Sequence, residues 1–218
     1  MPRFANVLFD LDGTLTDPFE GIAASICHAM KSLGHEPPSE SELRRAIGPP
    51  LRQSLGKFLN TDDAVRTAEA LRLYRECYSV TGLFENRVYP GVPEMLGSLK
   101  SAGLRLFVAT SKPAPFARRI IDRFEMARYF DGVYGAGLDG ALENKRDLLR
   151  FLLDSEGLDS TGTLMVGDRS HDIVGATANA VRAVGVTWGY GSREELQKSG
   201  ADLVCEQPEE VARFLKEG

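Results

Sequence analysis

Two aspartates near the start of the chain are the residues best placed to do chemistry. Asp10 and Asp12 follow the apolar run at 7–9 and precede a Gly13-Thr14 turn. An unpaired charge at the end of a buried strand costs several kcal/mol, so a cation or a substrate is expected beside these carboxylates. In open α/β sheets, ligands bind at the carboxyl ends of parallel strands. The pair therefore predicts an active site.

A second pair of aspartates follows another apolar run. Asp168 directly follows the segment 163–167, and Asp172 comes four residues after Asp168. Either acid alone could cap a helix, because aspartate is a common N-cap residue. Two acids at one strand end, together with Asp10 and Asp12, instead supply the oxygen ligands that Mg²⁺ prefers. We therefore expect Mg²⁺ as the cofactor.

Hydroxyl groups and a lysine complete the candidate site. Thr110 and Ser111 end an apolar segment, and Pro113 opens a helix, which is a favourable place to bind phosphate oxygens. Lys145 stands in the first turn of a predicted helix, where it opposes the helix dipole unless an anion lies nearby. A solvated lysine beside Asp147 is the alternative interpretation.

These residues need a parallel sheet to bring them together. Apolar segments at 4–9, 104–109, 132–135, 163–167, 183–187 and 203–205 alternate with helical patterns, which is typical of a parallel sheet covered by helices. The stretch from Asp17 to Tyr78 has helical spacing and no strand signal. We predict an α/β fold: a Rossmann-like core of residues 1–15 and 89–218, with residues 16–88 inserted as an all-helical cap.

Composition narrows the possible partners. The chain has 218 residues and a net charge of −5, which argues against nucleic acid or an anionic membrane as its partner. The apolar runs are too short to span a bilayer. The three cysteines are scattered and lack metal-ligand spacing, which favours a reduced compartment. We expect a cytoplasmic monomer or homodimer that acts on a small molecule.

The ordered set of acid pair, hydroxyl, lysine and acid pair resembles the haloacid dehalogenase-like hydrolase superfamily, and all four of its motifs are present. Within it, the chain is similar to phosphoglycolate phosphatase-type enzymes. Two short segments, 47–51 (IGPPL) and 135–140 (GAGLDG), resemble a bacterial branch described as 5′-nucleotidase-like. One departure is Arg146, where related phosphatases often have a proline after the lysine.

The resemblance implies a role for each motif. Asp10 would attack phosphorus, and Asp12 would serve as general acid and base. Asp10, Asp168 and the backbone carbonyl of Asp12 would hold Mg²⁺. Thr110, the backbone of Ser111 and Lys145 would hold the phosphoryl oxygens. Asp172 would orient Lys145 or metal-bound water.

The reaction expected from these roles is Mg²⁺-dependent hydrolysis of a small phosphate ester through an aspartyl-phosphate. Nucleoside monophosphates and phosphoglycolate are the two expected substrates. A sugar-phosphate mutase shares all four motifs and stays an alternative. A phosphate-receiver regulatory module also uses a strand-end aspartate, Mg²⁺ and a lysine, but it needs neither Asp12 nor a helical insertion.

Overall fold

The computed structural model describes residues 4–217, and the chain divides into two compact units. The core unit comprises the described residues up to Thr16 and those from Val88 onward. The helical unit comprises Asp17–Arg87. Each unit has its own buried interior and is described by itself.

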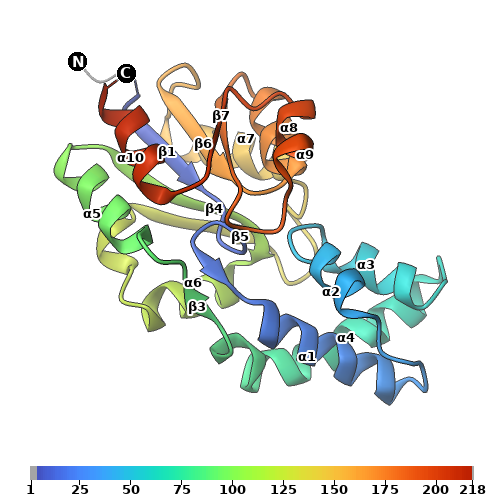
Figure 1. Cartoon of the computed structure of the whole chain (residues 1–218). Helices are drawn as coiled ribbons and strands as arrows, with labels where there is room; N and C mark the ends of the chain where they lie inside the picture. The colour runs from blue at the N-terminus through green and yellow to red at the C-terminus, as the bar shows by residue number, and fades with distance from the viewer. Residues whose placement is uncertain (1–3, 218) are drawn as a thin grey trace. The chain divides into compact units, whose positions relative to one another are not determined.

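A six-stranded sheet forms the centre of the core unit (Figure 1). Its strand order is β5-β4-β1-β6-β7-β8, and every neighbouring pair is parallel. This arrangement confirms the predicted α/β fold with a parallel sheet. The strands are β1 (Asn6–Phe9), β4 (Arg105–Pro113), β5 (Gly132–Ala136), β6 (Thr163–Gly167), β7 (Arg182–Val186) and β8 (Leu203–Cys205).

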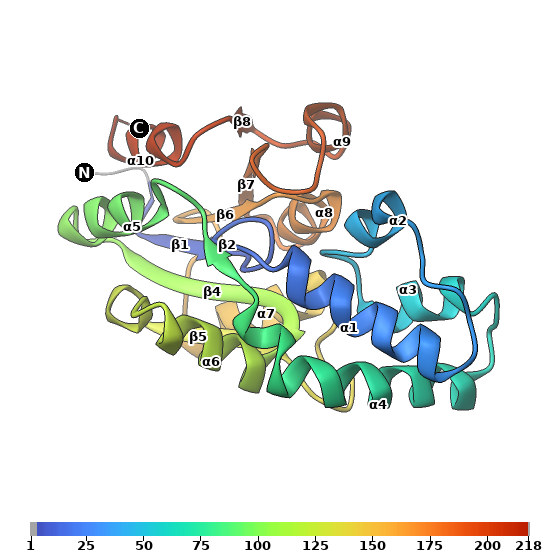
Figure 2. The same cartoon turned by 60° about the horizontal axis from the view of Figure 1, so that its bottom comes forward.

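Helices cover both faces of this sheet, which explains why its strands are apolar throughout instead of alternating. On one face α7 packs against β4 and α8 packs against β6 and β7, while α5, α6 and α10 lie on the other (Figure 2). The helices are α5 (Val92–Ser101), α6 (Ala114–Arg123), α7 (Lys145–Glu156), α8 (Ser170–Thr177), α9 (Arg193–Lys198) and α10 (Pro208–Glu217), with a short 3₁₀ helix η2 (Ala127–Tyr129).

The register of the sheet aligns large apolar side chains into one core. Leu8 of β1 is opposite Phe107 of β4 and Met165 of β6. These three side chains are fully buried and join a cluster with residues of α7 and α8, such as Leu149 and Ile173. The central strands are therefore fixed by packing on the face that α7 and α8 cover.

The same register brings the chemically active segments to one edge. Phe9, the last residue of β1, is opposite Val108 of β4 and Val166 of β6. Asp10 and Asp168, which follow β1 and β6, therefore leave the sheet side by side. The position of β1 between β4 and β6 thus determines which motifs can meet.

The helical unit contains four helices and a 3₁₀ turn among its residues: α1 (Phe19–Ser32), α2 (Glu40–Arg45), α3 (Leu51–Phe58), α4 (Ala64–Val80) and η1 (Gly82–Phe84). Helix α4 packs against α1 and α3. Tyr74 and Tyr78, one turn apart on α4, stack with ring centroids 5.2 Å apart and are both buried. The helical spacing of apolar residues seen in the sequence forms this interior.

Two very short strands occur where the chain passes from one unit to the other. β2 (Thr16–Asp17) pairs with β3 (Arg87–Val88) as a separate two-stranded sheet. The expectation of no strand from Asp17 onward is wrong at its first residue. A two-residue strand has too few positions to show a periodicity of two, so the pattern of the sequence does not reveal it.

In the part of the chain that the structure describes, no helix has both the length and the apolar character needed to cross a membrane.

Replacing Leu8 by alanine should lower the free energy of unfolding by about 2–5 kcal/mol, the range for large-to-small changes in a packed core. Leu8 is fully buried between two strands, so the cavity cannot be filled by solvent or by relaxation of a surface loop. Urea unfolding monitored by circular dichroism measures the change.

Leu203→Ala is the matched control, because Leu203 is also on a strand of the sheet but is 37% exposed. Its loss should be below about 1 kcal/mol. Equal losses in the two variants would contradict the packing described for β1.

Candidate active site

Three buried aspartates meet at the carboxyl edge of the sheet. Asp10 follows β1, Asp168 follows β6, and Asp172 lies in the first turn of α8. The three offer one carboxylate oxygen each within 4.8 Å of one another. These residues are 3%, 0% and 0% exposed, so solvent screens the repulsion between their carboxylates only weakly.

Lys145 supplies the positive charge for this group. Its Nζ lies 2.9 Å from Asp10 Oδ1 and 2.8 Å from Asp172 Oδ1, and it donates a hydrogen bond of 2.8 Å to the Ala109 carbonyl oxygen. At 4% exposure it is not the solvated lysine of the alternative interpretation. Two carboxylates therefore offset the unfavourable position of this lysine at the start of α7.

Glycines allow the close packing around Lys145. A Cβ on Gly175 of α8 would lie 2.8 Å from Lys145 Cγ. A Cβ on Gly167, the last residue of β6, would overlap the carboxyl group of Asp172. These two positions exclude any larger residue, so α7 and α8 can approach closely enough for Lys145 to reach the acids.

Asp172 has two functions in the local structure. Its Oδ2 accepts a hydrogen bond of 3.1 Å from the backbone N–H of Arg169, which closes the first turn of α8. Its Oδ1 pairs with Lys145. Helix capping and charge neutralisation therefore fix the same carboxylate from two sides.

Asp12 forms an ion pair that the sequence did not reveal. Its Oδ2 contacts the Nζ of Lys112, and both residues are 9% exposed. Lys112 follows Thr110 and Ser111 near the end of β4, but sequence reasoning gave it no role. The only signal available was a lysine two residues after the strand-end threonine, and lysine at such a position is unremarkable.

Thr110 and Ser111 lie on β4 beside this group. Thr110 is buried, and its Oγ1 accepts a hydrogen bond of 3.2 Å from the backbone N–H of Lys112. The Ser111 hydroxyl donates to the Glu143 carbonyl oxygen at 3.0 Å, which ties β4 to the segment before α7. The register of β4 against β5 shifts between Thr110 and Pro113, so the strand end is irregular where these residues lie.

Burial and neighbouring charges set the pKa values of the acids. Burial raises the pKa of Asp10 from 3.8 to about 6, although the Lys145 charge opposes the rise. Burial raises the pKa of Asp168 well above 3.8, and the negative charges of Asp172 and Asp10 add to the effect. Burial acts on Asp172 in the same direction, but the Lys145 charge holds its pKa below 3.8.

The donor set suits a hard divalent cation. Carboxylate oxygens are the ligands preferred by Mg²⁺ and Ca²⁺. Asp12 Oδ1 is buried nearby and has no hydrogen-bond partner among residues 4–217. More buried carboxylates than ammonium groups converge at this edge of the sheet, and a bound cation would reduce the excess of negative charge.

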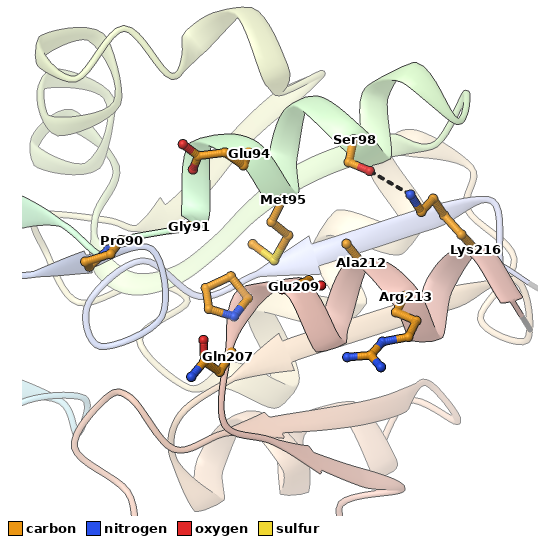
Figure 3. Close-up of a pocket in the computed structure, with 11 residues that line it drawn as sticks. Pro90, Gly91, Glu94, Met95, Ser98, Gln207, Glu209, Ala212, Arg213 and Lys216 are labelled. Carbon is orange, nitrogen blue, oxygen red and sulfur yellow. Dashed lines mark hydrogen bonds between the residues drawn. The ribbon is translucent and has the colours of Figure 1, made fainter.

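A groove of about 660 Å³ lies elsewhere in the core unit, and Figure 3 shows residues that line it. It runs between α5 and α10, where Lys216 donates a hydrogen bond of 3.0 Å to Ser98. Its lining mixes apolar side chains such as Met95 with charged ones such as Arg213. None of the residues expected in the active site borders it.

Comparison with known families identifies this arrangement. The sequence model of the family described as Haloacid dehalogenase-like hydrolase matches residues 7–186. The match covers most of the chain and all four motifs. The protein therefore belongs to this family of hydrolases.

Relatives point to the phosphatase branch of the family. A 5′-nucleotidase of Pseudomonas aeruginosa is 50% identical over 203 residues, which cover 93% of this chain and 91% of that protein. A phosphoglycolate phosphatase of Vibrio parahaemolyticus is 29% identical over an alignment that covers 96% of this chain and 95% of that protein. A Mycobacterium tuberculosis protein named tyrosine-protein kinase PtkA is 38% identical over 91% of this chain and 67% of its own length.

A solved structure agrees over nearly the whole chain. The crystal structure of a predicted phosphatase from Clostridium acetobutylicum superposes with a TM-score of 0.94 at 39% identity, covering 99% of each chain. Together with the family match and the relatives named 5′-nucleotidase and phosphoglycolate phosphatase, it shows that this protein is an enzyme, a haloacid dehalogenase-like phosphatase. Its resemblance to both phosphatase types was expected from the motifs.

In the metal-free protein, the contribution of Asp10 to the free energy of unfolding should fall as the pH rises. A carboxyl group whose pKa rises on folding holds its proton more tightly in the folded state. The stability that it contributes is present at low pH and is lost as the pH rises from about 4 through about 6. Wild type in EDTA should therefore lose stability relative to Asp10→Asn between pH 4 and pH 7.

Urea unfolding of both proteins at a series of pH values measures this difference. Asp154→Asn, at an exposed position on α7, is the control and should follow wild type at every pH. A constant gap between wild type and Asp10→Asn would show that Asp10 has no raised pKa in the folded protein.

Proposed function

We propose that this phosphatase is an Mg²⁺-dependent phosphomonoesterase that acts through an aspartyl-phosphate on a small organophosphate. The observation that carries the proposal is the buried Asp10 carboxylate, held by Lys145 beside Asp168 and Asp172. A carboxylate can attack phosphorus to form an acyl phosphate, and this splits one difficult hydrolysis into two easier steps.

Asp10 would act as the nucleophile. Lys145 holds its Oδ1 at 2.9 Å, so we assign the attack to Oδ2. Oδ2 forms a bond to phosphorus while the bond from phosphorus to the ester oxygen breaks. Fixing the carboxylate in advance avoids the entropy cost of orienting it during the reaction.

Asp12 would exchange the protons. It gives a proton to the departing alkoxide, then takes one from the water that attacks the aspartyl-phosphate, which releases phosphate and restores Asp10. The Asp12 Oδ2 is paired with Lys112, whereas Oδ1 is buried and has no hydrogen-bond partner in the described structure. We therefore assign proton transfer to Oδ1.

Asp10, Asp168 and the backbone carbonyl of Asp12 would hold Mg²⁺. When bound, the ion would neutralise charge on the phosphoryl group and so allow an anionic nucleophile to approach it. Asp172 would hold the Lys145 ammonium at 2.8 Å. That contact keeps the Lys145 ammonium fixed beside Asp10, where it would also contact the phosphoryl oxygens.

Thr110 and the backbone of Ser111 would bind phosphoryl oxygens together with Lys145. Thr110 is buried near the carboxyl end of β4, next in the sheet to the strand that precedes Asp10. The Ser111 hydroxyl is occupied by the Glu143 carbonyl, so its backbone N–H is the group that we assign to phosphate. Stabilising charge on the transferring group is the main catalytic task in such reactions.

Nucleoside monophosphates are the first substrate class that we propose, and phosphoglycolate is the second. The 50% identity to a protein named 5′-nucleotidase supports this order. Purified protein with Mg²⁺ should release inorganic phosphate from one of these classes in a panel that also contains sugar phosphates. Isomerised sugar phosphate without net phosphate release would instead indicate a mutase.

Asp10→Asn should abolish phosphate release, with a loss of more than about a thousandfold in kcat, because the amide cannot form an acyl phosphate. A phosphate-release assay measures the loss, and Asp154→Asn is the control with the same change at an exposed site. Near-normal turnover by Asp10→Asn would exclude Asp10 as the nucleophile.

Asp12→Ala should slow hydrolysis of alkyl phosphates by about 10²–10⁴-fold, the usual contribution of a positioned general acid. It should slow p-nitrophenyl phosphate far less in the first step, because nitrophenolate leaves without a proton. Steady-state and burst kinetics on both substrates, with Asp147→Ala as an exposed-acid control, make the comparison. Equal losses in the burst phase for the two substrates would argue against proton donation by Asp12.

A further inference from the structure

A loop far along the chain contacts both segments that carry the acids. The 188–191 loop (Trp188, Gly189, Tyr190 and Gly191) joins β7 to α9 and was not singled out by its sequence. The Tyr190 backbone N–H donates a hydrogen bond of 2.8 Å to Asp168 Oδ2. The Trp188 Nε1–H donates one of 2.9 Å to the Thr14 carbonyl oxygen.

The two glycines of this loop are required by space. A Cβ on Gly189 would lie 2.5 Å from Asp168 Oδ2 and would overlap the Gly13 carbonyl oxygen. A Cβ on Gly191 would overlap the Asp168 carbonyl oxygen. Any larger residue at either position would push the loop away from Asp168.

Gly13 also approaches the Asp168 carboxylate closely. Its φ of +88° is a conformation that favours glycine, and a Cβ there would overlap Asp168 Oδ2. The Thr14 hydroxyl donates to Asp168 Oδ1 at 3.4 Å. The Asp168 side chain is therefore contacted by both the 13–14 turn and the 188–191 loop, which restricts its rotation.

The donors around Asp168 leave part of its capacity unused. A carboxylate has about four acceptor positions. The hydrogen bonds from Tyr190 and Thr14 occupy one position on each oxygen. The remaining positions are available to a cation, and the carboxylate is already oriented by one backbone N–H and one hydroxyl group.

We propose that the 188–191 loop is a positioning element that holds Asp168 ready to bind the divalent cation. The inference rests on the proposed function, because it concerns the cation site of that reaction. Groups that orient a metal ligand commonly change metal affinity by about 10–100-fold when they are altered. Gly189 and the Tyr190 backbone do not touch the substrate or the cation; they act through Asp168.

The test is Mg²⁺ binding to Gly189→Ala, measured by isothermal titration calorimetry on the full chain. The variant should bind Mg²⁺ about 10–100-fold more weakly than wild type. Its phosphatase activity should recover when Mg²⁺ is raised, while its KM for the phosphate ester at saturating Mg²⁺ stays near that of wild type.

Gly162→Ala is the matched control. Gly162 also lies in a loop of the core unit, but its Cβ would meet Asp159 at an ordinary distance of 3.5 Å, and its φ is not positive. Its Mg²⁺ affinity should equal that of wild type. A weakening in this control as large as that in Gly189→Ala would overturn the inference, since it would show a general response to added bulk.

Trp188→Phe decides the matter if Gly189→Ala does not fold. This change keeps an aromatic ring of smaller size and removes the indole N–H donor to the Thr14 carbonyl oxygen, which anchors the loop to the acid-bearing turn. Mg²⁺ affinity should fall severalfold. A purely structural role would instead lower Tm in EDTA and leave the Mg²⁺ affinity of the folded protein unchanged, and that result would overturn the inference.

The wild-type measurements separate this inference from the proposed function. If wild type neither binds Mg²⁺ nor releases phosphate, the proposed function and the role of the loop are both disproved. If wild type binds Mg²⁺ and hydrolyses phosphate esters but Gly189→Ala and Trp188→Phe bind Mg²⁺ equally well, the proposed function stands and the role of the loop is disproved.

Discussion

The contact of Lys145 with two buried aspartates is the interaction on which the rest of the core unit depends. Its ammonium group lies within 3 Å of Asp10 and Asp172, which belong to segments more than 150 residues apart. Removing a lysine of this kind would leave buried carboxylates without a counter-charge, which costs several kcal/mol in other proteins. Lys145 begins α7, and the close approach of α8 at Gly175 leaves room for its side chain to reach both acids.

The fold tolerates this concentration of charge because the scaffold beneath it is apolar and rigid. β1 is buried on both faces and paired on both edges, so Asp10 leaves the sheet in a fixed direction. Burying these carboxylates together raises the free energy of the folded protein, since burial, and after it the neighbouring negative charges, raises the pKa values of Asp10 and Asp168. Active sites commonly carry such a cost, because the same charge excess that destabilises the protein attracts a cation and aligns a nucleophile.

Local patterns in the sequence predicted most of the elements. β6 and β8 begin and end where the apolar segments 163–167 and 203–205 do, and the other strands of the sheet differ by a residue or more at one end or both. β4 shows the largest extension, from the expected 104–109 to Arg105–Pro113, because pairing with β5 resumes at Pro113 after a shift in register. An apolar pattern within one segment can be recognised directly in the sequence, whereas the pairing of one strand with another cannot.

The sequence by itself determined the α/β class, the family motifs and the acids at the strand ends, since each depends on the order of residues within a short segment. Only the tertiary structure decided that Lys112 pairs with Asp12 and that the 188–191 loop contacts Asp168. The partners in those contacts are 100 and 22 residues apart. Their proximity comes from the order β5-β4-β1-β6-β7-β8, which packing against α7 and α8 fixes and which no local periodicity records.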